Sequence, residues 1–225
     1  MKALAVDLAV SKLTVSAKNE DHVVTAVYDI GMKQSETLLP AIDYVLQKVG
    51  LTAKDLEYLA LCQGPGSFTG LRLSFAALKA IQIANNIPLY GISTLDVYAE
   101  HYKNLPFTIL SCIDAKKERF YAKAFLENKE IFSEDDFTVE KIVELMKKNS
   151  SQNVLICGTD SELLHEKIKD ELNNFNIYTV KFEVNTTDQL FKILEEKIKK
   201  NEPPLNDYDG PVYLRASEAE VKLNN

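Results

Sequence analysis

The sequence is poor in the side chains that most often bind metals. Its 225 residues include three histidines, His22, His101 and His165, which lie far apart in unrelated segments. They form no H-x-x-x-H or H-E-x-x-H pattern, the spacing that places two zinc ligands on one helix face. We therefore expect no metal site, and a zinc hydrolase is disfavoured.

Cysteine is equally scarce, and tryptophan is absent. Each of Cys62, Cys112 and Cys157 lies in an apolar, strand-like run, and no C-x-x-C pair occurs. We expect three buried, reduced thiols, which suits a reducing compartment. The apolar N-terminus MKALAVDLAV is interrupted by Asp7 and lacks a cleavage site, and no run reaches the roughly 18 apolar residues of a membrane span. A cytoplasmic protein is expected.

Basic residues are too few for a protein that binds nucleic acid on its own. The chain has 26 lysines and arginines against 33 acidic residues, a net charge of -7. Proteins that bind nucleic acid directly usually carry a basic face that neutralises phosphates. A protein that binds nucleic acid on its own is therefore disfavoured, while a local basic patch stays open.

The two halves of the chain repeat one order of predicted elements: three strands, a helix, a strand, a helix and a strand. In the first half these are 2–8, 12–18, 22–30, 35–49, 58–63, 69–85 and 88–92. In the second they are 107–114, 119–127, 129–132, 138–148, 153–158, 160–174 and 177–183, followed by a charged helix over 186–200.

This order predicts the fold class. Three antiparallel strands followed by alternating helices and strands make a mixed sheet flanked by helices. Two such units in tandem describe the actin-like, ribonuclease-H-like (ASKHA) fold, here with subdomains 1–104 and 105–225. Beyond Pro203-Pro204 we expect a loop and a loosely attached tail.

In that fold, a hairpin after each strand-ending aspartate wraps the phosphates of a nucleotide through close backbone N–H groups. Asp7 and Asp114 end the first strand of each half, but the turns read DLAVSK and DAKKER, without glycine. We therefore expect no nucleotide cofactor, and interpret Asp7 as a turn residue whose hydrogen bonds are satisfied.

The stretch CQGPGSFTGLR, residues 62–72, resembles a phosphate-binding loop but matches no established pattern. Its glycines are spaced G-x-G-x-x-x-G, no lysine follows them, and there is no G-x-S-x-G. Two interpretations stay open. One is a tight turn in which Ser67 or Thr69 caps the next helix. The other is a weak anion site at the helix N-terminus, formed by Gly64, Gly66, Ser67, Thr69, Gly70 and Arg72.

The helix after this stretch is more apolar than one core requires. Leu71, Phe75 and Leu78 face one way, while Leu73, Ala76, Ala77, Ala80, Ile83 and Ala84 face largely another. Such a helix is either buried between elements of its own fold or forms a subunit interface, and small alanines allow another helix to approach closely. The helix over 35–49 precedes it and could join the same surface.

Five stretches together resemble the TsaB (YeaZ) family: SETLLPAID, CQGPGSFTGLR, GISTLD, SCIDAKKERFYA and PVYLR. The resemblance implies an inactive, actin-like paralogue of the TsaD transferase. With the ATPase TsaE, that system transfers a threonylcarbamoyl group to the adenosine beside the anticodon of certain tRNAs. Two departures are Asp7-Leu8-Ala9 where the family commonly has Asp-Thr-Ser, and Gln34-Ser35-Glu36 where it often has His-Ser-Glu.

The resemblance implies that the helices over 35–49 and 69–85 bind TsaD or a second copy of the chain, with TsaE and tRNA reached only through the complex. The expected interface residues are Ser35, Glu36, Leu38, Leu39, Ile42, Leu71, Arg72, Ser74, Phe75 and Leu78. A Phe75→Glu variant is expected to stay folded and lose association. The alternatives left open are an active actin-like ATPase or kinase and a metallopeptidase.

Overall fold

The computed structural model describes residues 1–180 and 185–215, apart from the side chain of Met32. These residues form two units. Unit 1 comprises Met1–Val97 and Asn185–Val212, and unit 2 takes the described residues between 98 and 180 and between 213 and 215. Each unit contains one five-stranded sheet.

The sheet of unit 1 has the order β3-β2-β1-β4-β5. Its strands are β1 (Lys2–Asp7), β2 (Leu13–Asn19), β3 (His22–Tyr28), β4 (Tyr58–Gly64) and β5 (Leu89–Ser93). Strands β1, β2 and β3 pair antiparallel, whereas β1, β4 and β5 run parallel. Short 3-10 turns lie at Gly31–Lys33 and Ala53–Asp55, and α3 (Thr94–Glu100) follows β5.

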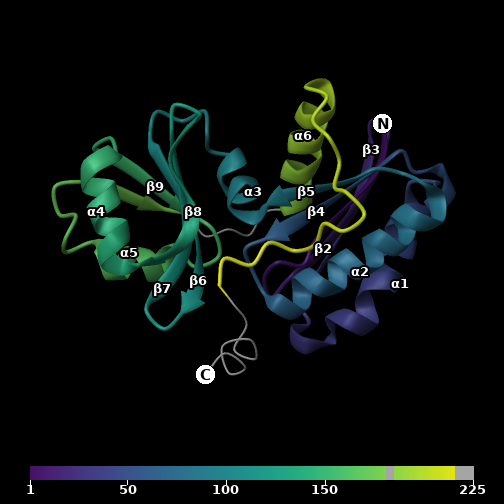
Figure 1. Cartoon of the computed structure of the whole chain (residues 1–225), viewed down its shortest axis with the longest axis horizontal. Helices are drawn as coiled ribbons and strands as arrows, with labels where there is room; N and C mark the ends of the chain where they lie inside the picture. The colour runs from purple at the N-terminus through teal and green to yellow at the C-terminus, as the bar shows by residue number, and fades with distance from the viewer. Residues whose placement is uncertain (181–184, 216–225) are drawn as a thin grey trace. The chain divides into compact units, whose positions relative to one another are not determined.

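Helices cover both faces of this sheet. On one face, α1 (Gln34–Lys48) and α2 (Phe68–Asn85) lie side by side (Figure 1), and α6 (Thr186–Lys199) contacts β1, β2, β4 and β5. Successive side chains of β1 point to opposite faces of the sheet, so the strand contributes to the helix layers on both sides. Leu4 and Val6 belong to the core shared with α1 and α2, whereas the small residues Ala3 and Ala5 lie outside that core.

Polar contacts fix α6 to unit 1. The hydroxyl of Thr186 donates to Asp7 Oδ2 over 2.6 Å, Thr187 hydrogen-bonds Ser16, and Lys18 Nζ lies 2.6 Å from Glu195 Oε1. The predicted division near residue 104 assigned this helix to the second subdomain, but in the structure it belongs to the first. Local sequence patterns indicate a helix without indicating which sheet it covers.

The sheet of unit 2 has the order β10-β9-β6-β7-β8. Taken from its other edge, β8-β7-β6-β9-β10, it has the same topology as β3-β2-β1-β4-β5 of unit 1. Its strands are β6 (Thr108–Lys116), β7 (Arg119–Leu126), β8 (Lys129–Thr138), β9 (Asn153–Cys157) and β10 (Asn176–Thr179), and α4 (Val139–Asn149) and α5 (Ser161–Ile168) pack on it. The predicted repeat is thus confirmed. Strand β8 runs six residues further than expected and α5 ends six residues earlier, while part of the predicted strand 177–183 lies outside the described residues.

The C-terminal segment is attached more firmly than predicted. Within unit 2, the guanidinium of Arg215 donates to both carboxylate oxygens of Asp136 (2.8 and 2.9 Å) and to the carbonyl of Ala115 (2.8 Å). Within unit 1, the N–H of Leu205 donates to the carbonyl of Leu89 and the N–H of Val212 donates to that of Gln63. The expectation of a loose segment is therefore wrong up to residue 215, and the rest of that prediction lies outside the described residues.

The cysteines behave as predicted. Cys62, Cys112 and Cys157 are free and buried, and burial raises the pKa of each thiol. None of the helices within residues 1–180 and 185–215 has the length and apolar character needed to cross a bilayer.

Candidate interface groove

Ser67 caps α2, and the GPGSFTG stretch is the turn that leads into this helix. The Oγ of Ser67 accepts a hydrogen bond from the N–H of Gly70 over 3.3 Å. The N–H of Ser67 donates to the carbonyl oxygen of Ala9, 2.6 Å away in the turn after β1. Thr69 lies inside the helix and is exposed. Of the two capping residues considered, Ser67 is therefore the cap.

The glycines of this turn accommodate backbone from elsewhere in unit 1. A Cβ at Gly66 would lie 2.3 Å from the carbonyl oxygen of Ala9, and one at Gly70 would lie 2.0 Å from that of Leu8. Real Cβ atoms do not approach so closely, so only glycine fits at these two positions.

This packing leaves the anion interpretation without support. The Ala9 carbonyl accepts the N–H of Ser67 and occupies the space in front of Gly66. The guanidinium of Arg72 lies 3.9 Å from the ring centroid of Phe68, a cation–π contact on the helix surface. The turn interpretation is the one that the geometry favours.

Asp7 is a satisfied turn residue, as predicted. Its Oδ1 accepts the N–H of Ala9 over 2.9 Å, and its Oδ2 accepts the hydroxyl of Thr186 over 2.6 Å. Burial raises the pKa of this carboxyl, and hydrogen bonds from Thr186, Ala9 and Cys62 partly offset that effect.

Asp114, the counterpart of Asp7 in unit 2, is hydrogen-bonded to a residue of its own hairpin. It accepts the N–H of Lys116 over 2.7 Å and the ammonium of the same residue over 2.6 Å. Partial burial raises its pKa, but the bonds from Lys116 dominate and lower it. Across the part of the chain that the structure describes, no three histidine, cysteine or acidic side chains are placed to hold a metal ion.

Six of the expected interface residues are buried inside unit 1. Leu38, Ile42, Leu71, Phe75 and Leu78 pack around its core, and Ser74 is buried with its hydroxyl bonded to the carbonyl of Leu71. Buried side chains have little surface to offer a partner. The interface predicted on the face of α2 that carries Leu71, Phe75 and Leu78 is therefore corrected, because this face packs inside unit 1. Phe75 is 5% exposed, and a glutamate there would place a charge in the core. The expectation that Phe75→Glu stays folded is corrected with it.

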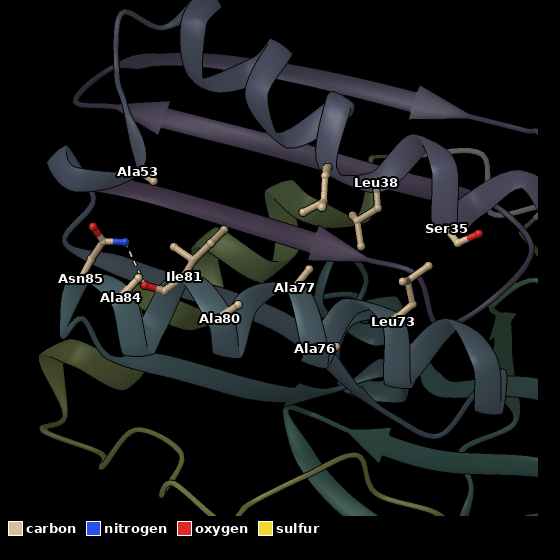
Figure 2. A pocket seen from close by; sticks show the side chains of 11 residues that line it. Ser35, Leu38, Ala53, Leu73, Ala76, Ala77, Ala80, Ile81, Ala84 and Asn85 are labelled. Atoms are coloured by element: carbon tan, nitrogen blue, oxygen red, sulfur yellow. Dashed lines mark hydrogen bonds between the residues drawn. The ribbon is translucent and has the colours of Figure 1, made fainter.

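The opposite face of α2 borders an apolar groove. The groove has a volume of about 520 Å³ and lies between α1 and α2, as Figure 2 shows. Leu38 lines its floor, while Ser35 and Asn85 are its polar members. The lining residues are Ser35, Leu38, Leu39, Ala53, Leu73, Ala76, Ala77, Ala80, Ile81, Ala84 and Asn85.

Exposed apolar side chains accompany the groove. Leu39 on α1 is 61% exposed and Ile83 on α2 is 77% exposed, while Ala76, Ala80 and Ala84 are exposed as well. Single exposed apolar residues are ordinary, whereas an apolar groove with apolar neighbours marks an interaction surface. Of the expected interface residues, Ser35, Glu36, Leu39 and Arg72 are exposed, and Ser35 and Leu39 line the groove.

The sequence had signalled part of this surface. Leu73, Ala76, Ala77, Ala80 and Ala84 were recognised as a second apolar face, but they were not chosen as the interface. Ala53, Ile81 and Asn85 were missed. Size is a partial signal, because Phe75 and Leu78 of α2 fill the core and its alanines border the groove, although Ile83 is 77% exposed.

Comparisons with known proteins identify the family. The family model described as "TsaD: tRNA N6-adenosine threonylcarbamoyltransferase" matches residues 31–220. A TsaB protein of Buchnera aphidicola subsp. Schizaphis graminum is 29% identical over 162 residues, covering 68% of this chain and 76% of its own. One from Bacillus subtilis is 24% identical over 230 residues, covering 99% and 97%. The chain belongs to the TsaB (YeaZ) family.

Solved structures of similar shape identify the fold. YeaZ from Pseudomonas aeruginosa superposes with a TM-score of 0.76 at 18% identity, over 95% of this chain and 99% of that one. A Bacteroides thetaiotaomicron protein with actin-like ATPase fold and unknown function gives 0.53 at 10% identity, over 85% and 95%. The predicted family and the predicted actin-like fold are both confirmed.

Proposed function

We propose that this chain is a non-catalytic subunit of the system that forms N6-threonylcarbamoyladenosine on tRNA. In this proposal it binds a TsaD-like transferase through the groove between α1 and α2. The observation that carries the proposal is the apolar groove itself, which leaves one face of a long helix uncovered in unit 1.

Family membership supports the biosynthetic assignment. Relatives that match most of this chain are named "tRNA threonylcarbamoyladenosine biosynthesis protein TsaB", and the matching family model describes the threonylcarbamoyltransferase. The actin-like transferase, rather than tRNA, is the partner that the groove suits. Its lining has no charged residue, whereas contact with phosphates calls for lysine and arginine.

The shape of the groove suits an α-helix. Ala76, Ala77, Ala80 and Ala84 are small, so a partner helix can approach α2 to an interaxial distance of about 8–10 Å. Leu39 and Leu73 stand on opposite helices and provide larger apolar contacts. Burying such side chains stabilises association by roughly 25 cal/mol per Å² of apolar surface before the costs of ordering are subtracted.

The absence of catalysis is supported by how the two aspartate hairpins are used. In active members of the fold, these hairpins would hold a nucleotide. Here both oxygens of Asp7 are hydrogen-bonded within unit 1, and Asp114 is bonded to Lys116 of its own turn. The chain would then assist the transferase without binding a nucleotide, and TsaE and tRNA would join through the transferase.

The test compares two exposed leucines on different helices. Leu39→Glu places a carboxylate in the groove, and Leu163→Glu places one on α5 of unit 2, where the leucine is 41% exposed. We expect Leu39→Glu to weaken binding to the same organism's TsaD by about tenfold or more, because a carboxylate in an apolar interface loses its hydration. Leu163→Glu should bind like the wild type.

The functional readout is formation of threonylcarbamoyladenosine with purified TsaD and TsaE. Product should depend on this chain and fall with Leu39→Glu. If Leu39→Glu binds TsaD and supports modification like the wild type, the groove is not the docking site. If modification proceeds equally without this chain, the proposed function is wrong.

A second copy of the chain is the competing occupant of the groove. Sedimentation of the purified chain with and without TsaD separates the two. We expect any self-association to be lost in Leu39→Glu and displaced by TsaD, since both would use the same groove.

A further inference from the structure

Residues 205–212, LNDYDGPV, form a segment that we call the strap, drawn in yellow beside β5 and α2 in Figure 1. At its start, the N–H of Leu205 donates to the carbonyl of Leu89 on β5 over 2.8 Å, and the Leu205 side chain packs against the core of unit 1. At its end, the N–H of Val212 donates to the carbonyl of Gln63 over 2.8 Å. The strap is therefore bonded at both ends to strands of unit 1.

The strap contacts the chain just before α2 begins. The Nε2 of Gln63 donates to the carbonyl of Gly210 over 3.1 Å. Gly64 has a φ of 125°, and a Cβ there would lie 2.3 Å from the carbonyl oxygen of Val212. The backbone of the strap thus fills the space that glycine leaves at this position.

The strap also contacts the middle of α2. The ammonium of Lys79 donates to the carbonyl of Asn206 over 2.6 Å and to that of Asp207 over 3.4 Å. The carboxylate of Asp209 accepts the N–H and the side-chain amide of Asn206, which closes the turn that presents these carbonyls. Hydrogen bonds to a charged ammonium are stronger than those between neutral groups.

The contacts at Gln63 and Gly64 precede α2, and Lys79 lies within the stretch of α2 from Leu73 to Asn85 whose residues line the groove. The buried residues of α2 end at Leu78, and the helix continues for seven more residues to Asn85. Beyond Leu78 the helix packs on the core of unit 1 only through partly buried side chains such as Ile81, and Lys79 is the first residue after Leu78.

We propose that the strap is a positioning element for α2, with Gly64 and Lys79 as its positioning residues. It holds the helix at its entry and at its middle, and so keeps the groove between α1 and α2 preformed. The link to partner binding rests on the proposed function, whereas the effect on α2 does not.

The experiment uses three variants of the full-length chain. Gly64→Ala introduces a Cβ against the Val212 carbonyl, and Lys79→Met removes the ammonium while keeping the apolar stem. Lys148→Met, on an exposed position of α4 in unit 2, is the matched control for Lys79→Met. Neither Gly64 nor Lys79 lines the groove.

Hydrogen–deuterium exchange measures the restraint directly. Loss of the two hydrogen bonds donated by the Lys79 ammonium is expected to speed exchange of the strap amides and of the α2 amides beyond Leu78 by about tenfold. Lys79→Arg should restore slow exchange, and Lys148→Met should leave unit 1 unchanged. Faster exchange in the strap with unchanged exchange in α2 would overturn the proposal. Since Lys79→Met leaves the GPGSFTG turn intact, the test stands even if Gly64→Ala does not fold.

Affinity for TsaD is the second measurement. We expect Lys79→Met to weaken binding by about threefold to tenfold, although the substituted side chain does not touch the groove. If α2 loosens while affinity is unchanged, the role in docking is overturned. If Leu39→Glu also leaves binding unchanged, the groove is not the docking site, and the exchange data still decide whether the strap restrains α2.

Discussion

The backbone N–H of Ser67 donates to the carbonyl oxygen of Ala9 over 2.6 Å, so the turn after β1 is hydrogen-bonded to the loop that precedes α2. This bond joins residues that are far apart in the sequence. It places the N-terminal hairpin against the start of the helix that borders the groove.

The glycine closest to this hairpin tolerates no side chain. In Gly70→Ala the new Cβ would lie 2.0 Å from the carbonyl oxygen of Leu8, so backbone would have to move. We expect the free energy of unfolding to fall by about 1–3 kcal/mol or more. Urea denaturation measures this. Gly210→Ala is the control, because a Cβ there meets nothing within 4 Å. Equal stabilities of the two variants would contradict the prediction.

Phe75 contributes to folding of unit 1 rather than to docking. We expect Phe75→Ala to lower the free energy of unfolding by about 3–5 kcal/mol, because it removes a buried ring and leaves a cavity. Phe68→Ala, at a ring that is 37% exposed, should cost about 1 kcal/mol or less. Thermal and denaturant unfolding test both variants, and a Phe75→Ala chain as stable as Phe68→Ala would refute the assignment to the core.

Asp7 makes stability depend on pH. Because its pKa is raised in the folded chain, the native state holds the proton more tightly than the unfolded state does. The wild type should therefore lose stability as the pH rises from the ordinary value of 3.8 through the raised pKa. In Asp7→Asn this loss should be absent. Unfolding free energies of both chains across that range measure the difference, and a difference that does not vary with pH would rule the effect out.

Arg215 fixes the end of the described chain to unit 2. Arg215→Met removes two hydrogen bonds to the nearly buried carboxylate of Asp136, which keeps Arg119 as a partner 3.0 Å away. Since Arg119 remains and Arg215 is partly exposed, we expect a loss of about 1–3 kcal/mol. Arg215→Lys should rescue little, because an ammonium cannot reproduce the forked geometry. Denaturation of the three chains decides this, and full rescue by lysine would contradict it.

The alternation of apolar residues was sufficient to predict the two sheets. Residues such as Leu4 and Val6 recur with the period of a strand, and the two halves repeat one order of elements, so the topology followed from local patterns. The placement of α6 did not follow, because its contacts with Asp7 and Lys18 join residues far apart in the sequence.

The site was harder to predict for a physical reason. A helix that is apolar on most sides gives no periodic signal for the stripe that faces the core. The sequence predicts Phe75 and Leu78 as interface residues although their size suits the core, and it predicts close helix approach at the alanines without naming them as interface residues. The strap depends on backbone carbonyls of Gly210 and Val212, which no side-chain pattern reveals.

The contacts of Gly66 and Gly70 also bear on the sequence at positions 8 and 9. Both glycines meet carbonyl oxygens, of Ala9 and Leu8, and every amino acid carries that atom. The family commonly has threonine and serine where this chain has Leu8 and Ala9. Because the acceptor for Ser67 is a backbone carbonyl, this difference leaves the hydrogen bond in place. Side chains at positions 8 and 9 can therefore differ without removing the backbone acceptor on which the turn before α2 depends.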